Sequence, residues 1–332
     1  MNNVTQFPSV VDYPELDAKA LHDASRGAGT AGIEVKRLFS QTEYLPTLHS
    51  RVTDVDNAIR ATSFKLREVV QSIGIKLAIN TKTLRAYQAE LSSAPDSDRQ
   101  EILEDIAAQI LKVSNVVNKE HNTLKKLHAP MTAAVDRIAT SQYLNQLAAD
   151  KVRLPTEMLE IDSRMDDLAE KRKILTQAMA LIEAKGFAEV GKETLLNAQE
   201  MAKLGMAGPE VAVVETAIEL AQQLMEKLEQ LVNYFGLMDA RNTVRKQMDD
   251  LLAKAHDKTA ELRLVDMKSN LITASHDFDD HRNLYISEFE KIIETNLSFL
   301  SVHRSVDAED QEAVSQFVID ASELANHLKV VG

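Results

Sequence analysis

The fold is decided by residues 48–91, LHSRVTDVDNAIRATSFKLREVVQSIGIKLAINTKTLRAYQAEL. Mostly apolar residues recur here at alternating steps of four and three, which places them on one face of a helix. One extra step of four, from Ile73 to Leu77 beside Gly74, shifts this seam. The pattern predicts one helix of about 45 residues with a continuous buried face. The seam comprises Leu48, Val52, Val55, Ile59, Thr62, Leu66, Val69, Ile73, Leu77, Asn80, Leu84, Tyr87 and Leu91.

A second helix of the same kind follows after a polar turn. Residues 92–98, SSAPDSD, combine turn-forming residues with a proline that ends a helix. The spacing resumes near Asp98, with Glu120 at one position of the seam, and Pro130 then bends or ends this helix. The two stretches predict an antiparallel pair of long helices. The second seam comprises Leu103, Ile106, Ile110, Val113, Val117, Leu124 and Leu127.

Further helices are expected on both sides of this pair. The glycines between 27 and 32 indicate either a break in a first helix or a close contact with a neighbouring helix. Pro155 predicts a kink or a restart, whereas residues 238–300 contain neither proline nor glycine and predict one continuous helix. Asp307, with Asp310 three positions later, predicts the cap of a last helix.

The composition agrees with a protein made of long helices. Only 10 glycines and 7 prolines occur in 332 residues, and aromatic residues make up 5%. A β-sandwich or barrel needs turn residues every ~8–12 positions, which this chain does not supply. An apolar content of 44% is close to that of globular proteins and argues against general disorder. The predicted fold class is all-α, an elongated antiparallel coiled-coil helical bundle.

Charge and cysteine content exclude several classes of function. The formal net charge of −13 disfavours binding to nucleic acid, because a phosphate backbone repels an acidic protein. The absence of cysteine excludes disulfides, thiol nucleophiles and cysteine metal sites. The first residues lack the basic start and apolar core of a secretory signal peptide. No stretch free of charged residues approaches the ~20 residues of a transmembrane helix, so we expect a product that is made soluble.

The segment between residues 174 and 238 is unusual for its glycines. Five of the ten glycines fall between Gly186 and Gly236. Residues 204–210, LGMAGPE, contain two glycines that are able to end one helix and a proline that is able to open the next. We therefore expect a helical hairpin with arms at 174–204 and 209–235 and a tip at 205–209.

The second arm of this expected hairpin has two distinct faces. Its apolar residues step by three and four, and its acidic residues lie on the opposite side. The apolar stripe comprises Val211, Val214, Ile218, Ala221, Met225, Leu228, Val232 and Phe235, and the acidic side carries Glu215, Glu219, Glu226 and Glu229.

Two interpretations of the hairpin remain open. In the first, its apolar stripe packs on the bundle as ordinary core. In the second, the hairpin leaves the soluble form and inserts into a bilayer. One hairpin alone would place its acidic face in lipid at a cost of several kcal/mol. A ring of hairpins avoids this cost, because glutamates then line water while apolar faces contact lipid and neighbours.

Catalytic and metal-binding motifs are not found. The densest histidine group, residues 276–281, HDFDDH, spaces its two histidines poorly for sharing one metal on a helix and is interpreted as a solvated acidic face. Adjacent carboxylates such as Asp166 and Asp167 point apart on a helix, whereas general acid–base catalysis needs them to converge. We therefore expect no enzymatic activity, no cofactor and no metal site.

The layout as a whole resembles a known family. Long heptad helices, no cysteine or tryptophan, and a central glycine-rich amphipathic hairpin around residues 203–209, KLGMAGP, are similar to the B component of the alpha-xenorhabdolysin-type binary toxins, relatives of cytolysin A among the α-helical pore-forming toxins. The resemblance extends over essentially the whole chain. It rests on architecture rather than on one signature motif.

The resemblance implies a function and partners. It implies a pore-forming toxin subunit that assembles with a partner A component and copies of itself into a ring on the host-cell membrane and permeabilises it. Residues 1–150 and 238–332 would form the tail and neck, and residues 151–237 the neck extension and a head with the hairpin. The subunit would be made soluble in the bacterial cytoplasm, and released without a recognisable signal peptide, by a route that the sequence does not identify.

The resemblance assigns roles to residues of the expected hairpin. Four glutamates, Glu215, Glu219, Glu226 and Glu229, are expected to face the lumen, which would favour cations. A cytoplasmic coiled-coil scaffold without membrane activity is the alternative. The expected membrane-inserting residues are Leu204, Gly205, Met206, Gly208, Pro209, Val211, Val214, Ile218, Met225, Leu228, Val232 and Phe235.

Overall fold

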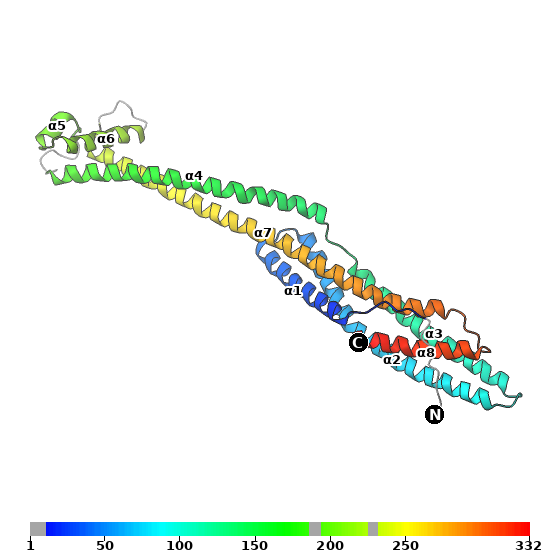
Figure 1. The fold of residues 1–332 in the computed structure, drawn as a ribbon. Helices are drawn as coiled ribbons and strands as arrows, with labels where there is room; N and C mark the ends of the chain where they lie inside the picture. The colour runs from blue at the N-terminus through cyan, green and yellow to red at the C-terminus, as the bar shows by residue number, and fades with distance from the viewer. Residues whose placement is uncertain (1–10, 186–193, 225–231) are drawn as a thin grey trace. The chain divides into compact units, whose positions relative to one another are not determined.

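The computed structural model describes residues 11–185, 194–224 and 232–332. Within these ranges the chain is built from α-helices and two short 3-10 turns (Figure 1), which confirms the predicted all-α bundle. One isolated antiparallel β-bridge pairs the backbone of Leu195 with that of Asn233. The helices are α1 (Ala18–Thr42), α2 (Pro46–Ser93), α3 (Arg99–His128), α4 (Arg137–Ala184), α5 (Ala198–Lys203), α6 (Pro209–Leu224), α7 (Tyr234–Val302) and α8 (Gln311–Leu328); the 3-10 turns are Ala129–Met131 and Lys329–Val331.

The chain divides into two compact units. The first consists of residues 1–142 and 267–332, and the second of residues 143–266. Each unit has its own cluster of buried apolar side chains. The predicted assignment of residues 1–150 with 238–332 to a tail and neck, and of 151–237 to a head, stays a prediction.

The predicted seam of α2 forms the core of the first unit. Apart from Tyr87, which is partly buried, every residue of the predicted seam is buried. This face packs against α1, α3 and α8. Inside the seam the buried side-chain amide of Gln109 donates to Asn80 Oδ1 at 2.9 Å. Such a polar pair fixes the register of two long helices, because a shift would leave both amides unsatisfied.

The polar intrusion predicted in the α3 seam is also buried. Glu120 is 7% exposed, and its Oε1 accepts from Ser72 Oγ at 3.3 Å and from Lys76 Nζ at 3.1 Å. A buried carboxylate needs such partners, since an unpaired charge in the core is strongly destabilising. At the start of α3 the buried seam begins one residue earlier than predicted: Ile102 is buried, whereas the predicted Leu103 is only partly buried.

Two expectations about prolines and caps differ from the structure. Helix α4 continues through Pro155, so a restart of the helix there is wrong, and the alternative of a kink stays a prediction. Leu154 is fully buried beside it, and this packing offsets the lost backbone hydrogen bond. The last helix is capped by Asp310, whose Oδ1 accepts from the backbone N–H groups of Glu312 and Ala313 at 3.0 Å. Asp307 instead accepts from Glu309 N in the preceding turn.

The interpretation of residues 276–281 as a solvated acidic face is wrong for one residue. Asp279 is 4% exposed, pairs with the buried Arg282 at 3.0 Å and accepts from Val135 N at 3.0 Å. Its carboxylate therefore ties α7 to the segment before α4. His276 Nε2 lies within hydrogen-bond distance of Thr140 Oγ1, at 2.8 Å.

The glycines of α1 mark a close contact between helices and not a break. Helix α1 runs through all of them. A Cβ at Gly27 would lie 2.4 Å from Nδ1 of the His281 ring, and at Gly32 it would lie 3.3 Å from Asp56 Cγ. The absence of side chains therefore allows α7 and α2 to approach α1.

Replacement of Gly27 by alanine should destabilise the fold. Within a helix, Gly→Ala ordinarily stabilises by roughly 0.5–1 kcal/mol. At Gly27 the clash with His281 reverses the sign, and we expect a loss of about 1–3 kcal/mol. Gly74→Ala is the matched control, because a Cβ at Gly74 meets nothing within 4 Å. Urea unfolding followed by circular dichroism measures both; equal effects of the two substitutions would contradict the contact.

Stability should fall as the solution is acidified. Burial lowers the pKa of His121, His276 and His303 below the ordinary 6.5. At His303, Asp320 accepts from the ring at 2.8 Å and offsets part of the effect. Just below pH 6.5 the unfolded chain therefore binds more protons than the folded chain. The free energy of unfolding has its full value above that pH and decreases as the pH falls below it. Urea midpoints at about pH 7.5 and about pH 5.5 test this. In His303→Gln the decline should be smaller.

Candidate functional site

The turn between α5 and α6, at the position of the predicted tip, is shaped by its glycines; the hairpin itself stays a prediction. Gly205 and Gly208 have φ of +67° and +55°, a left-handed backbone that favours glycine. A Cβ at either position would meet nothing within 4 Å, so backbone conformation and not space requires glycine. Met206 N donates to Met201 O at 3.1 Å, which closes α5. Pro209 then opens α6 at its first position.

The predicted arms of the hairpin are wrong as continuous helices. In the first arm, α4 ends at Ala184, residues 194–197 are not helical, and α5 has only six residues. Asn197 Oδ1 accepts from Glu200 N at 3.0 Å and caps α5. Leu196 N donates to Val232 O at 2.9 Å, so backbone pairing replaces helical hydrogen bonds here. In the second arm, residues 232 and 233, directly before α7, are not helical.

Two capping asparagines mark starts of helices that the spacing of apolar residues did not reveal. Asn233 Oδ1 accepts from Gly236 N at 2.9 Å just before α7 extends from Tyr234. With Asn197 it marks the two points at which helices restart. In the second arm the apolar spacing continues across Asn233, from Val232 to Phe235, so spacing alone predicts an uninterrupted helix there.

The apolar stripe of α6 faces the core of the second unit. Val214 and Ala217 are fully buried, and Leu220 and Ala221 are buried beside them. They belong to one cluster with Leu175, Ala178, Met179 and Ile182 of α4 and Leu237, Ala240 and Val244 of α7. Both sequence interpretations start from such a covered stripe, so the choice between them stays a prediction. Leu220, Leu196 and Met201 are core residues that the stripe did not include.

The predicted membrane-inserting residues that the structure describes fall into three groups. Leu204, Met206, Val214 and Val232 are buried; Val211 and Ile218 are half-buried; Gly205, Gly208, Pro209 and Phe235 are exposed. Of the predicted lumen-facing residues, Glu215 and Glu219 are exposed on the outer side of α6. Met225, Glu226, Leu228 and Glu229 lie outside the described residues. Their roles in insertion stay predictions.

Polar contacts join this segment to the end of α4. Lys185 Nζ lies 3.0 Å from Glu210 Oε2 of the first turn of α6, and each side chain is about one-third exposed. The Tyr234 hydroxyl, at the start of α7, donates to Glu183 Oε1. Burial and this neighbouring carboxylate raise the pKa of Tyr234. Such partly exposed contacts contribute little, about 0–1 kcal/mol each, so apolar packing dominates the docking of α6.

The described part of the chain holds no cluster of three or more histidine, aspartate or glutamate side chains suited to a metal ion. Over the same residues, no helix combines the length and apolarity needed to cross a membrane.

The packing of α6 should depend on Val214 far more than on the adjacent Val213. Val214 is fully buried, whereas Val213 is half-buried at the edge of the cluster. Val214→Ala should cost about 1–2 kcal/mol and speed hydrogen exchange of the α6 amides, because it leaves a cavity. Val213→Ala, the same chemical change, should cost less than half as much. Equal exchange rates in the two variants would mean that α6 is not docked as described.

Neither a protein-family model nor a curated protein matches the chain, but solved structures match it over nearly its whole length. XaxB from Xenorhabdus nematophila is 18% identical with a TM-score of 0.81, over 96% of this chain and 98% of that one. PaxB from Photorhabdus luminescens is 17% identical with a TM-score of 0.73, over 97% and 98%. The XaxAB pore complex from Xenorhabdus nematophila is 18% identical with a TM-score of 0.68, over 96% and 98%. The predicted resemblance is confirmed at the level of fold.

Proposed function

We propose that this chain is the B-type subunit of a binary α-helical pore-forming toxin and acts without enzymatic activity. The observation that carries the proposal is likeness over nearly the whole chain to a protein solved both alone and within a pore complex. The subunit would assemble with an A component and with copies of itself on a target-cell membrane. It would be made soluble and released by a route still to be identified.

The segment 204–235 is the proposed membrane-inserting part. In the described state Leu204, Met206 and Val214 of this segment are buried in one cluster with side chains of α4 and α7. Exposing Leu204, Met206 and Val214 to water would cost roughly 1.5–3 kcal/mol each. The docked arrangement is therefore favoured in water, and only an environment that covers the same side chains, such as lipid and neighbouring subunits, would favour release.

The charge pattern of α6 supports insertion as part of a ring. Glu215 and Glu219 share the side of α6 opposite to Val214. In a ring, the glutamates would line water while the apolar side contacts lipid and neighbouring helices. A lumen lined in this way would favour cations.

Site-specific labelling tests the insertion directly. The chain contains no cysteine, so one introduced cysteine gives one label. Ala207→Cys places a polarity-sensitive fluorophore on the exposed tip, and Ser97→Cys places it on the exposed turn between α2 and α3. With liposomes and a candidate A component, the label at residue 207 should shift to the blue and be quenched by spin-labelled lipid, whereas the label at residue 97 should not.

Dye release from the same liposomes links the signal to pore formation. Release without quenching at residue 207 would remove this segment from the mechanism. If neither release nor quenching occurs with any A component tested, the scaffold alternative is the better account.

A further inference from the structure

One face of α4 in the second unit is exposed and carries no charge. Its residues recur at alternating steps of four and three, which is the spacing of a seam between two helices. Each of them is exposed, and the two most apolar, Val152 and Leu159, are 74% and 69% exposed. We name this face the α4 strip; it consists of Asn145, Ala149, Val152, Thr156, Leu159 and Ser163.

The α4 strip lies on the solvent side of a helix whose other side is already in use. Leu147 and Leu154 are buried on that other side, and Lys151 Nζ pairs with Asp266 Oδ1 of α7 at 2.9 Å. The solvent side of a helix normally collects charged residues, and 27% of this chain is charged. An uncharged solvent side with heptad spacing therefore has the character of one half of an interface between helices.

The order of side chains along the α4 strip makes it complementary to its own reverse. When two copies of the strip run antiparallel, a small side chain faces a large one, two β-branched side chains of similar volume face each other, and the polar ends face polar ends. Such layers fill space evenly. A parallel pair would set alanine against alanine and leucine against leucine, which leaves one layer empty and crowds another. The antiparallel layers are Asn145 with Ser163, Ala149 with Leu159, and Val152 with Thr156 of the second copy.

The charges that border the α4 strip favour the same alignment. Two copies of a chain with a net charge of −13 associate only where acidic residues do not face each other. A parallel pair would place Asp166, the next position of the seam, opposite Asp166 of the second copy. In the antiparallel pair Glu160 lies beside Gln146 instead. Arg153 lies near its counterpart at the centre, but its charge is already paired with Glu157.

We propose that the α4 strip is the contact between two copies of this chain, which run antiparallel about a two-fold axis that passes between Val152 and Thr156. The strip is about 27 Å long and offers six residues per copy, whereas a stable complex uses about 20–30 residues per side. The pairing is therefore weak and depends on concentration. It does not rest on the proposed toxin function, because the free chain makes this contact in water.

Disulfide trapping tests the contact, because the chain contains no cysteine. Full chains with Asn145→Cys and with Ser163→Cys are mixed at high concentration and oxidised, and one of them carries a small tag so that mixed and like dimers differ in mass. We expect the mixed dimer at about ten times the yield of either like dimer, because identical cysteines lie about 27 Å apart in the antiparallel pair. Ala253→Cys, on the exposed side of α7 in the same unit, is mixed with Ser163→Cys to measure random collision.

A glutamate substitution then tests whether the strip itself makes the contact. Leu159→Glu in both cysteine variants should lower the yield of mixed dimer about tenfold, because it places a charge in an apolar layer. Leu252→Glu is the matched control at an exposed leucine of α7 and should leave the yield unchanged. Circular dichroism checks that each variant keeps its helices.

Three results would overturn the proposal. Like dimers in place of the mixed dimer would show a parallel contact. A mixed dimer no more abundant than that formed with Ala253→Cys would show that the strips do not meet. Equal yields with Leu159→Glu and Leu252→Glu would show that two copies associate through another surface.

Discussion

Burial of one unbroken face of α2 is the constraint on which the first unit depends. That face packs against α1, α3 and α8, so one helix of 48 residues organises most of the surrounding core. The hydrophobic effect makes this burial favourable but does not fix how far one helix slides along the other. The Asn80–Gln109 pair and the Glu120–Lys76 pair supply that specificity, since each is satisfied in one register only. The small residues of α1 extend the same packing to α7.

In the second unit, the docking of α6 follows a different rule. Helix α6 is held by buried apolar side chains, while its contact between Glu210 and Lys185 is partly exposed. Apolar burial is non-directional and can be replaced by any other apolar surroundings. Register pairs like those of the first unit cannot be replaced in this way. This difference suits a stable support in one unit and an exchangeable contact in the other, and it supports the proposed function.

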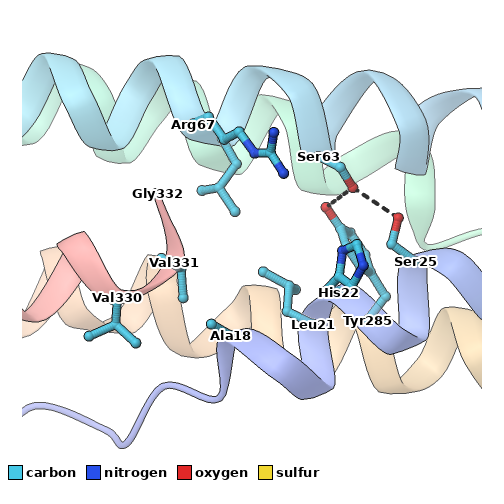
Figure 2. Close-up of a pocket in the computed structure, with 11 residues that line it drawn as sticks. Ala18, Leu21, His22, Ser25, Ser63, Arg67, Tyr285, Val330, Val331 and Gly332 are labelled. Carbon is cyan, nitrogen blue, oxygen red and sulfur yellow. Dashed lines mark hydrogen bonds between the residues drawn. The ribbon is translucent and has the colours of Figure 1, made fainter.

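Much of this fold was predictable because each long helix repeats the same spacing of buried apolar residues many times. The seam of α2, the polar turn at 92–98 and the uninterrupted α7 all follow from spacing and from the placement of proline and glycine. The errors arose where a single local interaction decides. Pro155 lies within a helix that does not restart there, beside the fully buried Leu154. The arms around the tip are interrupted because Asn197 and Asn233 cap new helices. The pocket lined by Ser63, Arg67 and Tyr285 (Figure 2) draws its residues from distant parts of the chain, and no local sequence pattern predicts their proximity.

The corner between α5 and α6 has one more consequence. Glycine adopts the positive φ angles of Gly205 and Gly208 without the strain that a Cβ would bring, and a Cβ at either position would meet no atom within 4 Å. The reversal therefore does not need side-chain packing around the two glycines. The larger cost of moving this segment would come from uncovering the apolar side chains that it buries among those of α4 and α7.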